Sequence, residues 1–109
     1  AAGTVFGFRS FRAFKHTFGR AGPGMAWHHI VEQHQRNVAR FGAEVIHNVQ
    51  NLVRLPQDVH GQINAYYSSK RLFTQGVTIR QWLRTQSLDA QRAFGLDVLR
   101  RVLAGLPLQ

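Results

Sequence analysis

The chain has 109 residues and no cysteine, and this absence constrains its fold more than any other feature of the sequence. Without disulfides or a Cys-containing zinc site, the fold must be held together by side-chain packing. The composition permits this, because 44% hydrophobic and 11% aromatic residues supply enough apolar material for one modest core. The same absence excludes a thiolate nucleophile, so any metal site must use histidine, asparagine or the scarce carboxylates.

The charge of the chain is strongly one-sided. Fourteen Lys and Arg residues oppose five Asp and Glu residues, for a formal net charge of +9. Such an imbalance attracts polyanions. Nucleic acid is the first candidate, and an anionic membrane or an acidic protein is the alternative. No signal peptide is visible, and no stretch approaches the roughly 20 apolar residues of a membrane span. The first residue is not Met, from which we expect a segment of a longer polypeptide, although processing would give the same start.

Glycine and proline divide the chain into short segments, a pattern typical of an α+β fold with little sheet. Phe11, Phe14 and Phe18 have helical spacing, with Ser10 as a cap and Gly19 as the end of the helix. Residues 25–31 read as extended, residues 32–41 are ambiguous between loop and helix, and residues 45–46 and 52–55 are short runs of strand type. We expect further helices over residues 57–70, 78–86 and 87–104, the last with an apolar stripe of Leu96, Leu99 and Leu103.

Polar residues that carry chemistry are concentrated between Trp27 and Ser69. A histidine pair, His28-His29, ends the first extended segment, and Asn51 opens the next one. His60 and Asn64 follow at positions i and i+4, so both can face one side of the next helix. Neighbouring residues on a strand point to opposite sides, so one histidine of the pair is expected to act from the strand end and the other from the adjoining loop.

This order of residues resembles the HNH, or ββα-metal, endonucleases. The matching pieces are His28-His29-Ile30, then Asn48-Val-Gln-Asn51-Leu52-Val53, and His60 at the family's usual spacing. The flanking residues are similar to those of the His-His subgroup, which occurs as C-terminal toxin domains of bacterial polymorphic toxins and has an active-site layout like that of the nuclease colicins. The resemblance covers residues 27–69.

The resemblance implies one nuclease domain over residues 1–109. A Phe/Arg-rich segment at 1–24 would precede a ββα-metal core at about 25–70, in which two short antiparallel strands support a metal-bearing helix, and a helical part would follow at about 71–109. His28 would bind a divalent metal ion and His29 would act as general base on the attacking water. Asn51 would orient the base imidazole through a hydrogen bond, and His60 would be a second metal ligand.

Asn64 stands where colicin-type members have another metal-binding histidine. This departure leaves the metal open among Zn, Ni, Mn and Mg. Arg54, Lys70 and Arg71 could neutralise phosphates beside the cut, with a solvated surface as the alternative for each. Asn48 could contact a phosphate or serve as a turn residue. Three histidines have no matched role and are expected to be structural or exposed: His16, His34 and His47.

The function implied is a metal-dependent endonuclease that cuts DNA, in preference to RNA, with little sequence specificity. As an antibacterial toxin domain it would be delivered within a larger secreted bacterial protein and act in the cytoplasm of the target cell. A small acidic immunity protein would restrain it in the producing cell. Two alternatives remain open: an RNase that uses the same site, and a nonenzymatic basic module that binds nucleic acid or an acidic partner.

Overall fold

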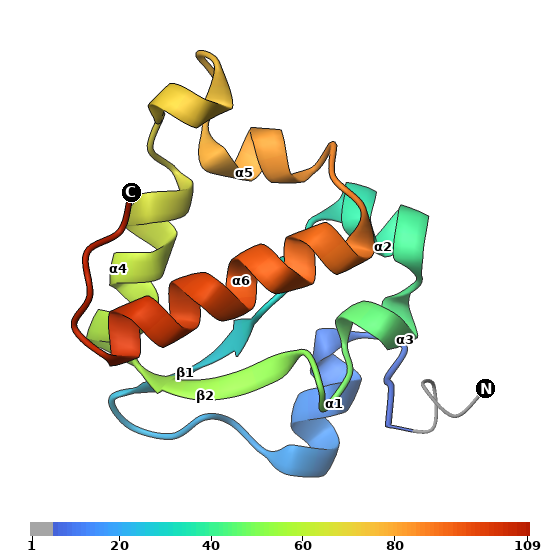
Figure 1. Cartoon of the computed structure of the whole chain (residues 1–109). Helices are drawn as coiled ribbons and strands as arrows, with labels where there is room; N and C mark the ends of the chain where they lie inside the picture. The colour runs from blue at the N-terminus through green and yellow to red at the C-terminus, as the bar shows by residue number, and fades with distance from the viewer. Residues whose placement is uncertain (1–5) are drawn as a thin grey trace. The chain divides into compact units, whose positions relative to one another are not determined.

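The computed structural model describes residues 6–109, and the expected α+β fold is confirmed (Figure 1). Residues 1–5, which belong to the expected Phe/Arg-rich segment, lie outside the described residues. The chain divides into two compact units, and the boundary between Pro56 and Gln57 falls within the segment expected to form the ββα core. No helix within residues 6–109 is long and apolar enough to cross a membrane.

The first unit is built on a two-stranded antiparallel sheet, in which Met25 pairs with Pro56 and His29 pairs with Leu52. Figure 1 shows the two strands side by side, with two short helices in the connection between them. The bounds of the elements are α1 Phe11–Phe18, β1 Met25–His29, α2 Gln35–Phe41, α3 Ala43–Ile46 and β2 Leu52–Pro56.

Helix α1 has the bounds that its sequence predicts. The Ser10 hydroxyl accepts a hydrogen bond from the Ala13 N–H at 3.0 Å, which satisfies a donor that the first turn leaves open. Gly19 ends the helix with φ 85°, a conformation that favours glycine. The Phe14 ring is buried and packs edge-on against Trp27 of β1, with 5.0 Å between ring centroids. This contact attaches α1 to the strand that carries both candidate histidines.

The expectation of a strand at residues 45–46 is wrong, because these residues lie in helix α3. Gly42, with φ 95°, turns the chain between α2 and α3. The α3 carbonyls of Glu44 and Ile46 accept hydrogen bonds from asparagine side chains, so they need no strand partner. Two apolar residues are too short a run to distinguish a strand from a buried helical turn, and tertiary burial decides between them.

The ambiguous segment at 32–41 contains helix α2. The imidazole of His34 accepts a hydrogen bond from the Arg36 N–H and caps the helix. Asn37 is buried, and its amide donates to the Glu32 carbonyl at 3.0 Å. His34 therefore has a structural role, as the sequence predicts.

The second unit is helical and packs around a cluster of aromatic rings. Phe94 lies 5.6 Å from Trp82 and 6.0 Å from Tyr67, measured between ring centroids. The elements are α4 Gln57–Tyr67, the 3-10 helix η2 Leu72–Thr74, α5 Ile79–Leu83 and α6 Leu88–Leu103. Thr78 and Ser87 cap α5 and α6 through their hydroxyls.

The apolar stripe expected on α6 is only partly correct. Leu99 is buried, whereas Leu96 and Leu103 are 47% and 59% exposed. The buried face of α6 is formed instead by small and polar residues beside leucine and valine, namely Gln91, Gly95, Val98 and Leu99. Gln91 is accommodated because its amide donates to the Gln86 carbonyl at 3.1 Å.

Candidate functional site

The histidine pair lies within β1, of which His29 is the last residue. His28 and His29 are 4% and 6% exposed, and successive side chains on a strand point to opposite faces of the sheet. The expected division, with one imidazole on the strand and the other in the adjoining loop, is therefore wrong. Both imidazoles are held by the strand, which gives each a fixed direction.

His29 faces α1 and meets a second imidazole. Its ring lies edge-on to Phe11 with 4.8 Å between centroids, and its Nε2 atom is 3.2 Å from Nδ1 of His47. The Phe11 ring also stacks on His47, at 6.3 Å and 9° between the planes. His47 is buried, and burial lowers its pKa because a low-polarity surrounding disfavours the imidazolium.

His47 has no role in the site that the sequence predicts, and it belongs to no motif. It lies eighteen residues from His29 and forms the C-terminal cap of α3. The pairing depends on the irregular connection between β1 and β2, where the Phe8 N–H donates to the His47 carbonyl at 2.8 Å. Such a contact has no period in the sequence that could predict it.

Asn51 holds the segment after β1 through three side-chain hydrogen bonds. Its Oδ1 accepts from the Val31 N–H at 2.8 Å, and its Nδ2 donates to the carbonyls of Val31 and Ile46 at 2.9 and 2.8 Å. The direct hydrogen bond expected between this amide and the His29 imidazole is not made. Asn51 instead positions His29 through the backbone, because the Ile30 N–H also donates to the Asn51 carbonyl.

Asn48 and Arg54, expected to contact substrate, both make bonds within the first unit. The Asn48 amide is buried, donates to the Glu44 carbonyl and accepts from the Gln50 N–H. These bonds correspond to the turn role that the sequence leaves open. Arg54 is exposed on β2, and its Nε donates to the Ala21 carbonyl at 2.7 Å, which ties the strand to the loop before β1.

The remaining predicted residues belong to the second unit. His60 and Asn64 lie one turn apart on α4, where His60 is half-buried and Asn64 is exposed. Burial lowers the pKa of His60, which favours the neutral imidazole that binds metals. Lys70 is exposed, whereas the Arg71 guanidinium lies over the Tyr66 ring at 4.9 Å and its Nε donates to Ser69.

The donor chemistry of His28, His60 and Asn64 fits a divalent cation, because two imidazoles and an amide oxygen are ligands that Zn, Ni and Mn accept. Within residues 6–109 there is no group of three or more His, Asp and Glu side chains placed to hold a metal ion. Comparisons with protein-family models, curated proteins and solved structures gave no match. The nuclease resemblance therefore depends on the residues of the chain itself.

The buried imidazole of His47 predicts a pH-dependent stability. Its folded-state pKa lies below the ordinary value of 6.5, so the unfolded chain binds the proton more readily. The free energy of unfolding should therefore decrease as the pH falls below 6.5. The lowered pKa of His60 acts in the same direction. Urea unfolding at pH 7.5 and 5.5 measures this, and His47→Gln should reduce the dependence. A dependence unchanged in His47→Gln would contradict the assignment to this residue.

Proposed function

We propose that this chain is a metal-dependent endonuclease that hydrolyses phosphodiester bonds of DNA with little sequence specificity. The observation that carries the proposal is the order along the chain of a strand that ends in a histidine pair, its antiparallel partner strand and a helix. Helices α2 and α3 lie in the connection between the two strands. Helix α4 begins at Gln57, directly after β2 ends at Pro56, and carries His60 and Asn64 one turn apart. This succession has the order of a ββα-metal core.

In the proposed reaction, His29 takes a proton from a water molecule whose oxygen attacks the phosphorus, and the ester oxygen on the opposite side leaves. An imidazole suits this role near neutral pH. The contact between His29 Nε2 and His47 Nδ1 requires one ring to donate and the other to accept, so it restricts the tautomer of His29. Asn51 keeps the end of β1 in place through the backbone.

His28, His60 and Asn64 are the proposed ligands of one divalent ion. When bound, such an ion stabilises the negative charge that grows on the phosphate during attack. His28→Ala and His60→Ala should each weaken binding of Zn or Ni, measured by calorimetry, whereas His34→Asn keeps a capping side chain and should not.

The proposal includes a biological role as an antibacterial toxin domain delivered within a larger bacterial protein and acting in the cytoplasm of the target cell. Its net charge of +9 supports a small acidic immunity protein as the partner that restrains it, because opposite charges accelerate association and favour the correct partner. A pull-down with the products of the neighbouring genes should recover such a protein. Recovery of none would contradict the toxin role and leave the nuclease chemistry untouched.

The decisive experiment is a cleavage assay with the pure chain. Plasmid DNA and an RNA of similar length are each incubated with Mg, Mn, Ni or Zn, and with EDTA. We expect nicking and linearisation of the plasmid with at least one ion and none with EDTA. Preferential cutting of RNA would instead assign an RNase that uses the same residues. Salt-sensitive binding without any cleavage would refute an enzyme and leave a basic nucleic-acid-binding module.

A further inference from the structure

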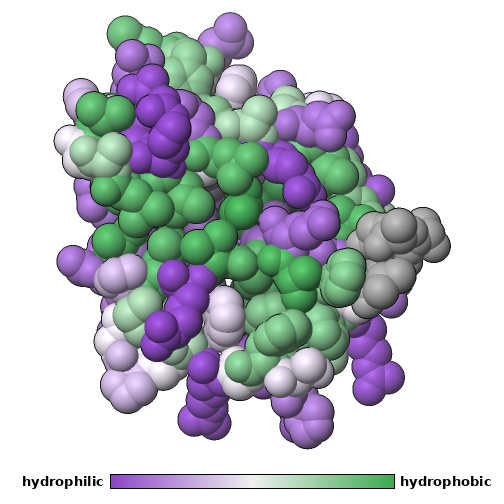
Figure 2. All heavy atoms as spheres, turned by 60° about the horizontal axis from the view of Figure 1, so that its bottom comes forward, coloured by the Kyte–Doolittle hydropathy of each residue, from purple (hydrophilic) through white to green (hydrophobic). Residues whose placement is uncertain are grey.

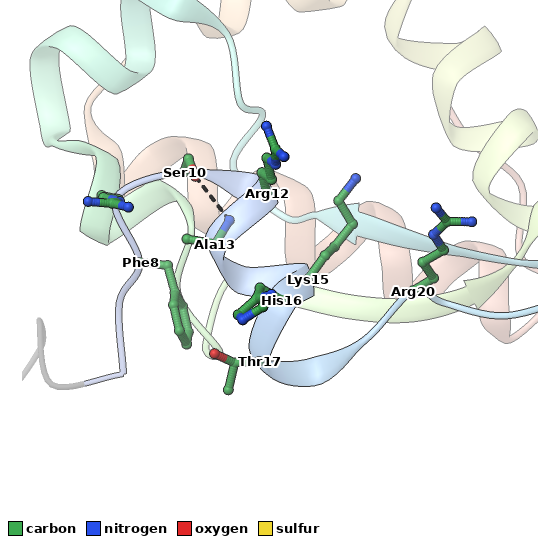
Figure 3. Close-up of a pocket in the computed structure, with 9 residues that line it drawn as sticks. Phe8, Ser10, Arg12, Ala13, Lys15, His16, Thr17 and Arg20 are labelled. Atoms are coloured by element: carbon green, nitrogen blue, oxygen red, sulfur yellow. Dashed lines mark hydrogen bonds between the residues drawn. The ribbon is translucent and has the colours of Figure 1, made fainter.

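A row of basic side chains lines the exposed side of α1 and its two ends. Arg9, Arg12, Lys15, His16 and Arg20 border a hollow of about 670 Å³, and we call these five residues the α1 basic surface. In Figure 3 the labelled Arg12, Lys15 and Arg20 side chains extend to the same side of the segment. On the face of the molecule drawn in Figure 2, hydrophilic side chains lie between hydrophobic patches.

The α1 basic surface is not neutralised within its own unit. No Asp or Glu occurs before Glu32 in the sequence. Over residues 6–56, no carboxylate forms an ion pair with Arg9, Arg12, Lys15 or Arg20. Lys15 keeps its direction because its ammonium lies 4.3 Å from the centre of the Phe11 ring. Four full positive charges are therefore presented to solvent from one short segment.

The number and closeness of these charges suit a phosphate backbone. Arg12 and Lys15 are three residues apart on a helix, about 4.5 Å along its axis. Successive phosphates of one DNA strand advance about 3.4 Å along the duplex axis. Guanidinium groups also offer paired donors that match phosphate oxygens. A linear polyanion with closely spaced charges therefore fits the α1 basic surface.

The same helix contacts the candidate base from its buried side. Phe11 lies against the His29 ring, with 4.8 Å between centroids, while Arg12 and Lys15 are directed to its accessible side. A phosphate held on α1 would therefore lie within about one helix diameter, roughly 10 Å, of His29. The surface is thus close enough to hold a backbone whose neighbouring phosphates extend towards the site.

We propose that the α1 basic surface binds the sugar-phosphate backbone of the DNA substrate. This inference rests on the proposed function for the identity of the polyanion. The surface differs from the cations that the sequence predicts for substrate, namely Arg54, Lys70 and Arg71.

The test compares two double variants of the full chain that each lose two positive charges. Arg12→Gln/Arg20→Gln removes charge from the α1 basic surface, and Arg36→Gln/Arg92→Gln removes it elsewhere. Fluorescence anisotropy with a labelled DNA duplex, in EDTA to prevent cutting, gives the affinity between about 50 and 200 mM salt. The α1 variant should lose about tenfold in affinity at low salt, and its slope of log affinity against log salt should become shallower by about two.

The control variant should keep a slope close to that of the unaltered chain. Equal shallowing in both variants, or in neither, would overturn the proposal. Loss of binding to polyglutamate with unchanged DNA binding would also overturn it and would assign the surface to an acidic protein. Because the binding measurement contains no metal, the two proposals can fail separately. DNA binding through the α1 basic surface without any cleavage refutes only the nuclease. Cleavage of DNA together with unchanged DNA affinity of the α1 variant refutes only this surface.

Discussion

Replacing His29 with alanine should lower plasmid cleavage by about two to four orders of magnitude, the usual contribution of a general base. The loss is expected because the substitution removes the proposed base itself, and the neighbouring His47 already uses its Nδ1 to contact His29 Nε2 at 3.2 Å. The measurement is the initial rate of supercoil loss at saturating metal. Metal affinity should be retained, since His29 is not one of the proposed ligands of the ion.

His29 is also part of the core of the first unit, so a loss of activity must be separated from unfolding. His29→Gln retains much of the volume beside Phe11 and can still hydrogen-bond to His47. It should melt close to the unaltered chain and show the same loss of cleavage. Undiminished cutting by a folded His29→Gln chain would refute the assignment of the base. His34→Asn serves as the control, because its capping role is preserved and it has no place in the reaction.

Asn51→Ala should lower the free energy of unfolding by about 3 to 5 kcal/mol. The substitution removes three hydrogen bonds of 2.8 to 2.9 Å and leaves the N–H and carbonyl of Val31 and the carbonyl of Ile46 without the Asn51 amide. Val31 and Ile46 are almost completely buried, so water cannot replace the lost Asn51 amide as their partner. Against a typical total of about 5 to 15 kcal/mol, this is a large share.

The same substitution at Asn64 is the matched control. Asn64 is exposed on α4, and alanine is the better helix former, so Asn64→Ala in EDTA should change the free energy of unfolding by less than about 0.5 kcal/mol. Urea denaturation of both variants compares the two sites directly. Equal, small effects at Asn51 and Asn64 would show that the Asn51 amide does not hold the β1–β2 connection together.

Local signals predict several elements of this fold well. The bounds of α1 follow from the spacing of Phe11, Phe14 and Phe18 and from the capping chemistry of Ser10 and Gly19. The cap at Ser87 is predicted equally well, because a serine hydroxyl before an amphipathic segment can accept a hydrogen bond from a free N–H of the first helical turn. The prediction fails at residues 45–46, where the run is too short to show a period.

The site residues divide in a similar way. The sequence identifies His28, His29 and Asn51 as belonging together. The pairing of β1 with β2 places Asn51, the residue before β2, beside the end of β1, where its carbonyl accepts from the Ile30 N–H. It does not predict the bonds that Asn51 makes, because an amide can satisfy backbone or side-chain partners equally well. Nor does it predict the meeting of His29 and His47, which depends on the path of an irregular connection.

By itself the sequence determined the bounds of α1, the cap of α6, the polyanion-attracting charge and a fold held together without cysteine, because capping residues, charge and covalent chemistry act locally or by composition. Only the tertiary structure decided that His29 faces Phe11 and His47, that Asn51 holds the backbone instead of an imidazole, and that the cations of α1 share one accessible side. These outcomes depend on which groups are buried against each other, and burial is a property of the folded chain as a whole.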